Sequence, residues 1–223
     1  MPTLYIVATP IGNLEDVTLR ALEVLRQVEL IAAEDTRRTK HLLSKYEIKT
    51  PVTSYHEHNK RTKLPRLLQH LEQKDLALVS EAGMPGISDP GYELIAAAIE
   101  RGFRVVPIPG PSAITTALAA SGLPTRQFIY LGFLPRKRGE RRKLLQQLSE
   151  EQRTLVAFES PYRLRAALED LRDVLGERRL AIGRELTKLH EEIFYGTPSE
   201  ALEHFSQPRG EFTLVIEGKS KPT

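Results

Sequence analysis

The sequence LALVSEAGMPGISDPGY, at residues 76–92, contains an apolar run, a long loop and the start of a helical pattern. The apolar run is typical of a fully buried parallel strand. Small and turn-forming residues follow as far as Gly91. Connections between a strand and a helix usually run about 2–6 residues, and this one is about twice as long. We therefore interpret it as a binding loop, in which glycines let backbone N–H groups approach a ligand closely.

Similar apolar runs lie on both sides of this stretch, with helical patterns between them. They predict strands at Leu4–Ala8, Leu30–Ala33, Val52–Tyr55 and Arg104–Ile108, and Asp16 is the expected N-cap of the first helix. The alternation predicts βαβ units and a mainly parallel sheet. Ligands bind at the carboxyl ends of such strands. Five loops should meet there: Thr9–Asn13, Glu34–Arg38, His56–Asn59, Ser80–Gly91 and Pro109–Ala113.

A change of composition at Ser121–Thr125 (SGLPT) predicts a boundary between two domains, 1–120 and 121–223. The second domain should be a mixed α/β domain. Its expected strands are Phe128–Leu131, Leu155–Phe158, Leu180–Gly183, Ile193–Tyr195 and Phe212–Glu217. The predicted fold class is thus α/β, with two domains.

The composition excludes several kinds of chemistry. The chain of 223 residues has no cysteine, which excludes disulfides, thiolate metal sites and a cysteine nucleophile. No apolar stretch approaches the roughly 18 residues of a membrane span, so we expect a cytoplasmic protein without a membrane segment. Neither GxxxxGK[ST] nor GxGxxG after the first strand is present, which argues against a P-loop NTPase and the usual dinucleotide site. We interpret His56 and His58 as a solvated strand end, and expect no metal.

Basic residues form one dense run and two smaller clusters. Six cations lie within Arg136–Lys143, and others lie at Arg37, Arg38 and Lys40 and at Lys60–Lys63. The run follows a Gly-Phe-Leu-Pro turn, which favours a protruding cationic loop that binds a phosphate backbone over a solvated face. Aromatic residues make up 6% of the chain and tryptophan is absent, so no stacking platform for single strands is evident.

Longer segments resemble those of a known family. In chain order they are TPIGNLEDVTLRALEVL, AEDTRRTKHLL, SYHEHN, VSEAGMPGISDPGY, IPGPSAITTALAASGLP, GFLPRKRGER, FESPYRL, GRELTKLHEE and GEFTLVIEGK. They cover nearly the whole chain and are similar to those of the ribosomal RNA small subunit methyltransferase I family, within the tetrapyrrole methylase superfamily. The resemblance implies an enzyme that uses S-adenosylmethionine, bound in the cleft between two α/β domains of a homodimer. It also implies 2′-O-methylation of a cytidine ribose in the decoding region of 16S rRNA, in the small ribosomal subunit.

The resemblance further implies which residues bind the cofactor and the RNA. The cofactor residues are Pro10, Ser80, Glu81, Ala82, Gly83, Asp89, Ser112, Ala113, Glu159 and Gly183. With the charge pattern, it points to RNA contacts at Arg37, Arg38, Lys40, Arg136, Lys137, Arg138, Arg141, Arg142 and Lys143. The GxGxGD turn of the tetrapyrrole enzymes is replaced by TPIGNL, which disfavours a tetrapyrrole substrate.

For the reaction, Asp35 is the candidate base and Lys188 the candidate cation for the developing alkoxide. The alternatives are an N-cap and a surface ion pair. Asp89 has an alternative role in organising its loop by capping Gly91 and Tyr92. Two other functions stay open: a tetrapyrrole methylase, and a ribosome-binding factor that has the fold without the cofactor.

Overall fold

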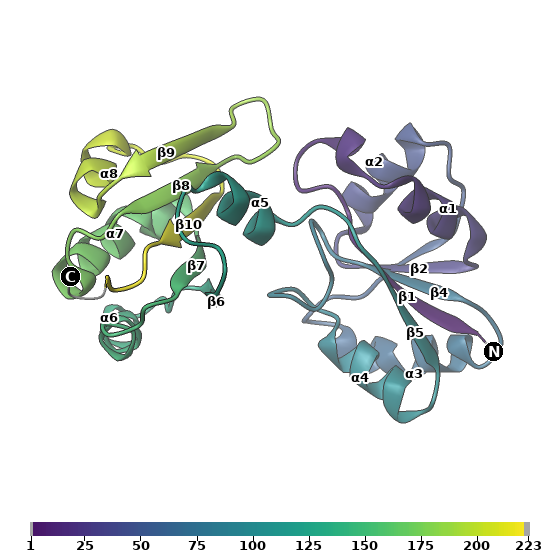
Figure 1. Ribbon diagram of the computed structural model, residues 1–223. Helices are drawn as coiled ribbons and strands as arrows, with labels where there is room; N and C mark the ends of the chain where they lie inside the picture. The colour runs from purple at the N-terminus through teal and green to yellow at the C-terminus, as the bar shows by residue number, and fades with distance from the viewer. Residues whose placement is uncertain (1, 221–223) are drawn as a thin grey trace. The chain divides into compact units, whose positions relative to one another are not determined.

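The computed structural model describes residues 2–220, and the chain divides into two compact units, unit 1 (Met1–Ser112) and unit 2 (Ala113–Thr223) (Figure 1). We expected the boundary after residue 120. Helix α5 (Ala113–Ala120) instead belongs to unit 2, because it packs against three strands of the second sheet. No helix among residues 2–220 is long and apolar enough to cross a membrane.

Unit 1 contains a five-stranded sheet in the order β3-β2-β4-β1-β5. Its strands are β1 (Thr3–Val7), β2 (Leu30–Ala33), β3 (Val52–Ser54), β4 (Leu76–Val79) and β5 (Arg104–Ile108). Every pairing is parallel, which confirms the predicted sheet. The carboxyl ends of the five strands therefore lie at one edge, as the parallel arrangement requires.

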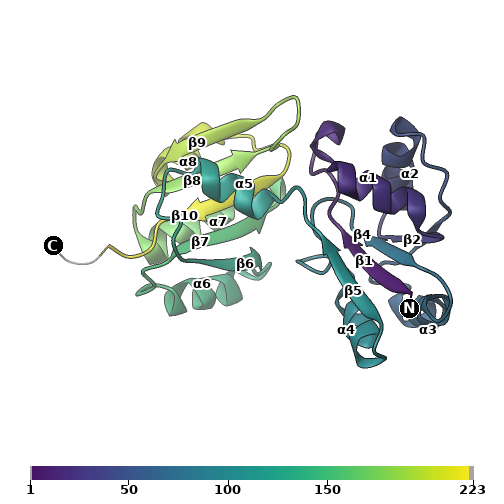
Figure 2. The same ribbon diagram turned by 45° about the vertical axis from the view of Figure 1, so that its right-hand side comes forward.

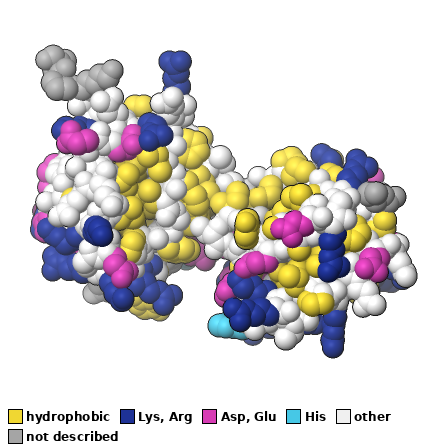
Figure 3. Space-filling view, turned by 90° about the horizontal axis from the view of Figure 1, so that it is seen from below, with side chains coloured by type: hydrophobic (Ala, Val, Ile, Leu, Met, Phe, Trp, Pro, Cys, Tyr) yellow, Lys and Arg dark blue, Asp and Glu magenta, His cyan; other side chains and the backbone are white. Residues whose placement is uncertain are grey.

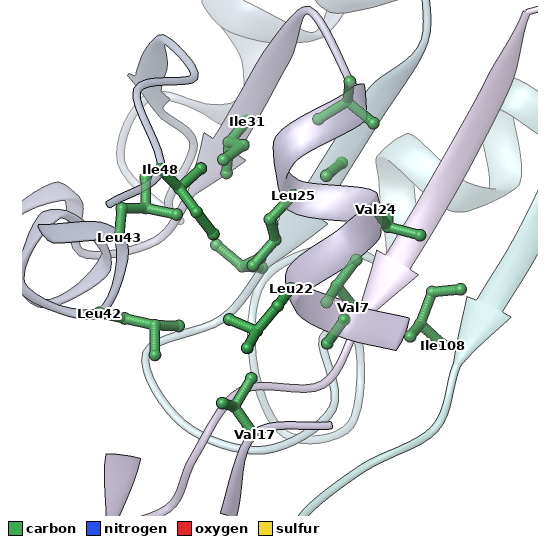
Figure 4. Close-up of a cluster of buried hydrophobic side chains, with 14 of the residues drawn as sticks. Val7, Val17, Leu22, Val24, Leu25, Ile31, Leu42, Leu43, Ile48 and Ile108 are labelled. Atoms are coloured by element: carbon green, nitrogen blue, oxygen red, sulfur yellow. The ribbon is translucent and has the colours of Figure 1, made fainter. Parts of the chain in front are cut away.

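Two helices cover each face of this sheet (Figure 1). Helices α1 (Leu19–Gln27) and α2 (Thr36–Lys45) pack on one face, where Leu22, Leu25 and Leu42 join a buried cluster (Figure 4). Helices α3 (Lys60–Leu71) and α4 (Tyr92–Glu100) form a second buried cluster with the other face. The four buried residues of β4 explain its unbroken apolar run, because both of its faces are covered.

The start of the first helix differs from the prediction. Asp16 lies in a short 3₁₀ turn, Leu14–Asp16, and Thr18 is the N-cap of α1, with its hydroxyl accepting a hydrogen bond from Ala21 N at 3.1 Å. The prediction for Asp16 was wrong because Val17 is extended and buried in the core, which separates the turn from the helix.

Unit 2 contains a mixed sheet in the order β6-β7-β10-β8-β9. Its strands are β6 (Phe128–Phe133), β7 (Thr154–Glu159), β8 (Leu180–Arg184), β9 (Glu192–Gly196) and β10 (Phe212–Ile216). Only β6 and β7 pair in parallel. Helices α6 (Arg138–Gln147), α7 (Pro161–Leu175) and α8 (Pro198–His204) cover one face, and α5 lies on the other (Figure 2).

Candidate active site

The long loop after β4 is joined to the loop after β1 at the carboxyl edge of the unit 1 sheet. Thr9 N donates to Gly83 O at 2.9 Å, and Gly83 N donates to Thr9 O at 2.9 Å. Gly83 has φ +79° and Gly91 has φ +146°, and a Cβ added at Gly91 would lie only 3.0 Å from Leu78 Cδ2. Residues that carry a side chain rarely adopt such φ values, so the backbone path of this loop depends on glycine.

Three carboxyl groups gather at this edge, from Glu34 after β2 and from Glu81 and Asp89 in the loop after β4. Glu34 Oε2 accepts a hydrogen bond from Glu81 N at 3.1 Å, and Arg38 Nη1 lies 2.8 Å from Glu81 Oε1. We call Glu34, Glu81 and Asp89 the acidic edge. Arg38 neutralises only one of its three carboxylates.

Burial raises the pKa of Asp89 to about 7, and the negative charges of Glu34 and Glu81 add to this effect against a hydrogen bond with Ser80. Burial also raises the pKa of Glu34. No ion pair among the described residues involves Asp89. The acidic edge is therefore short of positive charge, and a cation bound there would lower the pKa of Asp89.

Asp35, the candidate base, is the N-cap of α2. Its Oδ1 accepts hydrogen bonds from Arg37 N at 2.7 Å and from Arg38 N at 3.3 Å. The hydrogen bond from Arg37 N is the main reason that the pKa of Asp35 is lowered. A lowered pKa makes the carboxylate a weaker base, so the observed contacts favour the alternative of a helix cap.

The other expected cofactor residues of this region lie in the same loops. Ser80 is buried, and its hydroxyl lies 3.3 Å from the carbonyl oxygens of Ala82 and Gly83, so it shapes the loop from within. Pro10 and Ala82 are half-buried. Ser112 ends unit 1 and Ala113 begins α5.

Glu159, expected at the cofactor, has a side chain that is completely buried inside unit 2. Its Oε1 accepts a hydrogen bond from Ser160 N at 2.7 Å and lies 2.7 Å from Arg163 Nη2. Burial raises its pKa against these contacts. The carboxylate thus anchors the start of α7 from within the unit, and a cofactor contact at Glu159 stays a prediction about this strand end.

Gly183, the other cofactor residue expected in this unit, lies buried on β8. A Cβ there would be 2.9 Å from Leu186 Cδ2, so the close packing of Leu186 explains the glycine.

Lys188, the candidate cation, is held by two carboxylates of unit 2. Its Nζ lies 3.0 Å from Glu185 Oε1 and 3.1 Å from Glu211 Oε2. Burial acts to lower the pKa of Lys188, but these hydrogen bonds outweigh it and the pKa is raised. The ammonium group is thus charged and fixed in place. Thr187, next to it, has a left-handed φ of +65°, an uncommon conformation for a threonine.

The basic run is not a free loop, because most of it forms α6 and binds Asp170 of α7. Arg141 is 3% exposed, and its Nη2 and Nε lie 2.6 and 2.8 Å from Asp170 Oδ2. Arg138 Nε and Arg142 Nη1 each lie 3.1 Å from Asp170 Oδ1. Arg141 is therefore in the interior, and its prediction as an RNA contact is corrected by this burial.

The remaining expected RNA contacts are at the surface. The side chain of Arg37 is 92% exposed, that of Lys137 is 82% exposed and that of Arg138 is 65% exposed. Arg38 is exposed but paired with Glu81, and Arg142 is half-buried between Asp170 and Asp173. Lys40, Arg136 and Lys143 are also exposed.

One buried polar group escaped the sequence analysis, and another differs from its prediction. Asp170 was missed, although a carboxylate beside the apolar positions of α7 indicates a buried partner. His56, expected at a solvated strand end, is half-buried instead, with an Nδ1 that is buried and has no hydrogen-bond partner, and it acts to lower the pKa of Glu34 in the acidic edge. No group of three or more His, Cys, Asp or Glu residues within residues 2–220 is arranged to hold a metal ion.

Comparison with known proteins agrees with this architecture. The family model of the Tetrapyrrole (Corrin/Porphyrin) Methylases matches residues 3–202. The fold is similar to that of a cobalt precorrin-4 methyltransferase, with a TM-score of 0.71 and 18% identity, covering 96% of this chain and 94% of that one. A diphthine synthase structure gives a TM-score of 0.73 at 15% identity, covering 99% of this chain and 91% of that one. The fold is thus that of the tetrapyrrole methylases, a class of methyltransferases.

Proteins with similar sequences show which family within this class the chain belongs to. Proteins named ribosomal RNA small subunit methyltransferase I from Halalkalibacterium halodurans and Thermotoga maritima are each 52% identical to the chain. The alignments cover 98% of this chain in both cases, and 77% and 100% of the two relatives. The chain belongs to the ribosomal RNA small subunit methyltransferase I family.

Proposed function

We propose that the protein transfers a methyl group from S-adenosylmethionine to the 2′-hydroxyl of a cytidine ribose in the decoding region of 16S rRNA. The names of the relatives support ribosomal RNA of the small subunit as the substrate. The exposed cations of both units suit a phosphate backbone. The nucleotide and the methylated atom rest on the family resemblance. On the same ground we propose a cytoplasmic homodimer.

The observation that best supports S-adenosylmethionine as the cofactor is the acidic edge of unit 1, whose negative charge is only partly neutralised. S-adenosylmethionine supplies an activated methyl group on a positively charged sulfur, and because its amino acid part is a zwitterion, the cofactor has a net positive charge. Asp89 has no cationic partner among the described residues and a pKa raised to about 7. A cationic ligand removes this unfavourable charge pattern, so the residues present fit the cofactor.

We assign the loop after β4 the main role in holding it. Asp89 provides negative charge, whereas the carboxylate of Glu81 is paired with Arg38. Ala82 and Gly83 provide backbone groups without a bulky side chain. Pro10, Ser112 and Ala113 are proposed contacts on the resemblance. Ser80 acts through the loop, since its hydroxyl faces the loop carbonyls.

For the acceptor, we propose that fixing the ribose hydroxyl in line with the methyl group supplies most of the rate enhancement. Orientation alone contributes up to about 7–11 kcal/mol in well-ordered systems. Asp35 then acts as a positioning residue that fixes the start of α2 and the exposed Arg37. Lys188 remains our candidate for stabilising the developing alkoxide, because its ammonium is charged and ordered.

The test is to incubate the protein with methyl-labelled S-adenosylmethionine and isolated small ribosomal subunits, then to map the labelled nucleotide. We expect label on one cytidine ribose, and none on large subunits used as the control. Label transferred to a tetrapyrrole but not to subunits would favour the tetrapyrrole methylase alternative. Subunit binding without any thermal shift on adding S-adenosylmethionine would favour a binding factor that lacks the cofactor.

A further inference from the structure

Four aromatic side chains line the β6–β7 side of the unit 2 sheet, and we call Phe128, Tyr130, Phe133 and Phe158 the aromatic edge. The register pairs Phe128 with Thr154, Tyr130 with Val156 and Phe133 with Phe158. The ring centroid of Phe158 lies 5.4 Å from that of Tyr130 and 5.5 Å from that of Phe133, both in edge-to-face geometry. The rings of Tyr130, Phe133 and Phe158 therefore support one another, as aromatic pairs at these distances do.

Strand β6 is one of the two edge strands of its sheet, and rings of the aromatic edge are exposed at the surface there. Phe133 is 55% exposed and Phe128 is 39% exposed. Tyr162, in the first turn of α7, is 96% exposed. Arg163 Nη1 donates to Leu134 O at 3.0 Å, so the chain neighbours of Phe133 and Tyr162 are in direct contact. The exposed rings of Phe128 and Phe133 on this strand are the kind of apolar surface that binds a partner.

Positive charge follows Phe133 closely in the chain. Arg136 and Lys137 follow Phe133 in the chain, both are exposed, and they lead into α6. Helix α6 is held on α7 by the buried Asp170, so these cations have a defined position. One face of the molecule shows hydrophobic side chains beside Lys and Arg side chains in this unit (Figure 3). The surface combines flat apolar rings with cations.

We propose that the aromatic edge is a stacking site for an unpaired base of RNA, with Arg136 and Lys137 binding the flanking phosphates. The inference rests on the proposed function in taking RNA as the partner, and it adds a base-binding site in unit 2. A single-stranded nucleotide supplies both a flat ring and a negative charge, which is the chemistry that this surface complements. A protein partner would have to place acidic groups opposite the cations.

The absence of tryptophan from the sequence provides a direct optical test. The variant Phe133→Trp carries a single tryptophan, whose fluorescence reports stacking. The probes are a five-residue oligocytidylate and an abasic strand with the same number of phosphates. We expect the oligocytidylate to quench the fluorescence and the abasic strand to leave it unchanged.

A second variant, Phe133→Leu, keeps an apolar side chain but removes the ring. Stacking contributes about 1–3 kcal/mol per base, so we expect oligocytidylate binding to weaken by about 5- to 150-fold while the abasic strand binds as before. Tyr195→Leu, an exposed aromatic on the opposite edge strand β9, is the matched control and should leave binding unchanged.

Three outcomes would overturn the proposal: no binding of oligocytidylate, equal binding of the abasic strand, or equal binding by Phe133→Leu. Dissociation of an oligomer by Phe133→Leu in sedimentation would assign the surface to a second copy of the chain instead. The failures are separable, because binding is measured without methyl transfer. A protein that stacks the base but methylates no subunit would lack only the proposed function. A protein whose Phe133→Leu variant methylates subunits normally, and whose Phe133→Trp variant shows no quenching, would lack only the stacking site.

Discussion

Each unit contains an aspartate whose pKa is shifted by its surroundings, and the two shifts have opposite signs. In unit 1, burial and the neighbouring carboxylates raise the pKa of Asp89 to about 7. In unit 2, burial acts on Asp170 in the same direction, but hydrogen bonds from Arg141, Arg138 and Arg142 outweigh it and lower the pKa. The number of cations around each carboxyl group, rather than burial, decides the sign of the shift.

This difference distinguishes a carboxylate that stabilises the fold from a carboxylate that is available to bind a ligand. Asp170 fixes a helix by binding three arginines, so its charge is already compensated. Asp89 carries an uncompensated charge at the edge where five strands end. A site that holds a cationic ligand has the second pattern, because the ligand itself completes the charge balance.

The substitution with the largest expected effect is Asp170→Asn, which leaves the interior guanidinium of Arg141 without its counter-charge. We expect a loss of about 3–5 kcal/mol in the free energy of unfolding at pH 7, measured by urea denaturation. Asp173→Asn, with a side chain 35% exposed, is the control and should cost less than about 1 kcal/mol. A loss for Asp170→Asn as small as that of the control would show that the two carboxylates are equivalent.

The next effect concerns Asp89→Asn, which should stabilise the protein without cofactor. The folded state holds the proton of Asp89 more tightly than the unfolded chain, so the cost of ionisation grows from about pH 4 to about pH 7 and stays constant above. After allowance for solvent screening, we expect a gain of about 1–2 kcal/mol at pH 8 and a smaller gain at pH 5. Urea denaturation at both pH values measures it, with Asp16→Asn as the control.

Binding of S-adenosylmethionine should move in the opposite direction. Asp89→Asn removes a charge that we propose complements the cofactor, so calorimetric titration should show weaker binding. A variant that gained stability and bound the cofactor as tightly as the parent protein would show that Asp89 does not contribute to this site.

A smaller effect distinguishes the two roles of Asp35. Asp35→Ala removes the cap of α2 and should cost about 1 kcal/mol, whereas asparagine caps a helix about as well as aspartate. We therefore expect Asp35→Asn to retain both stability and turnover in the subunit methylation assay. Loss of turnover in a fully stable Asp35→Asn protein would restore Asp35 as the base.

The smallest effect on stability is expected for the exposed cations. Replacing Arg136 and Lys137 by alanine should weaken RNA binding and reduce its salt dependence by a slope of about 0.7 for each lost phosphate contact with a single strand. Binding measured across a series of salt concentrations tests this. Arg101→Ala, an exposed cation at the end of α4, is the control. If the salt dependence of RNA binding were unchanged in the double variant, Arg136 and Lys137 would be solvated side chains that do not contact RNA.

Local patterns were sufficient for the elements of the fold. The strands at Leu30–Ala33 and Arg104–Ile108 have the predicted bounds. In the first of them the apolar run corresponds to burial, since three of its four residues are buried. The position of the first helix cap was not predictable in this way. Val17 is drawn into the core by contacts that are remote in the chain, and the helix begins only after it.

The stacking surface shows a second limit of sequence reasoning. An aromatic content of 6% predicted no platform, but the total does not tell where the rings lie. Strand pairing brings Phe133 and Phe158 together although they are far apart in the chain. Composition averages over the molecule, while binding depends on a local cluster.

By itself, the sequence determined the class of the fold, the loop after β4 and, through its long family segments, the kind of enzyme. These depend on periodicity and on contiguous motifs, which a linear reading contains. Only the tertiary structure decided which charges are buried and which stay at the surface. Arg141 and Lys137 are equivalent in the sequence, but Asp170, from a different helix, buries the first and leaves the second at the surface. The pairing of charges is a non-local property, because it depends on which groups folding brings within a few ångströms of each other.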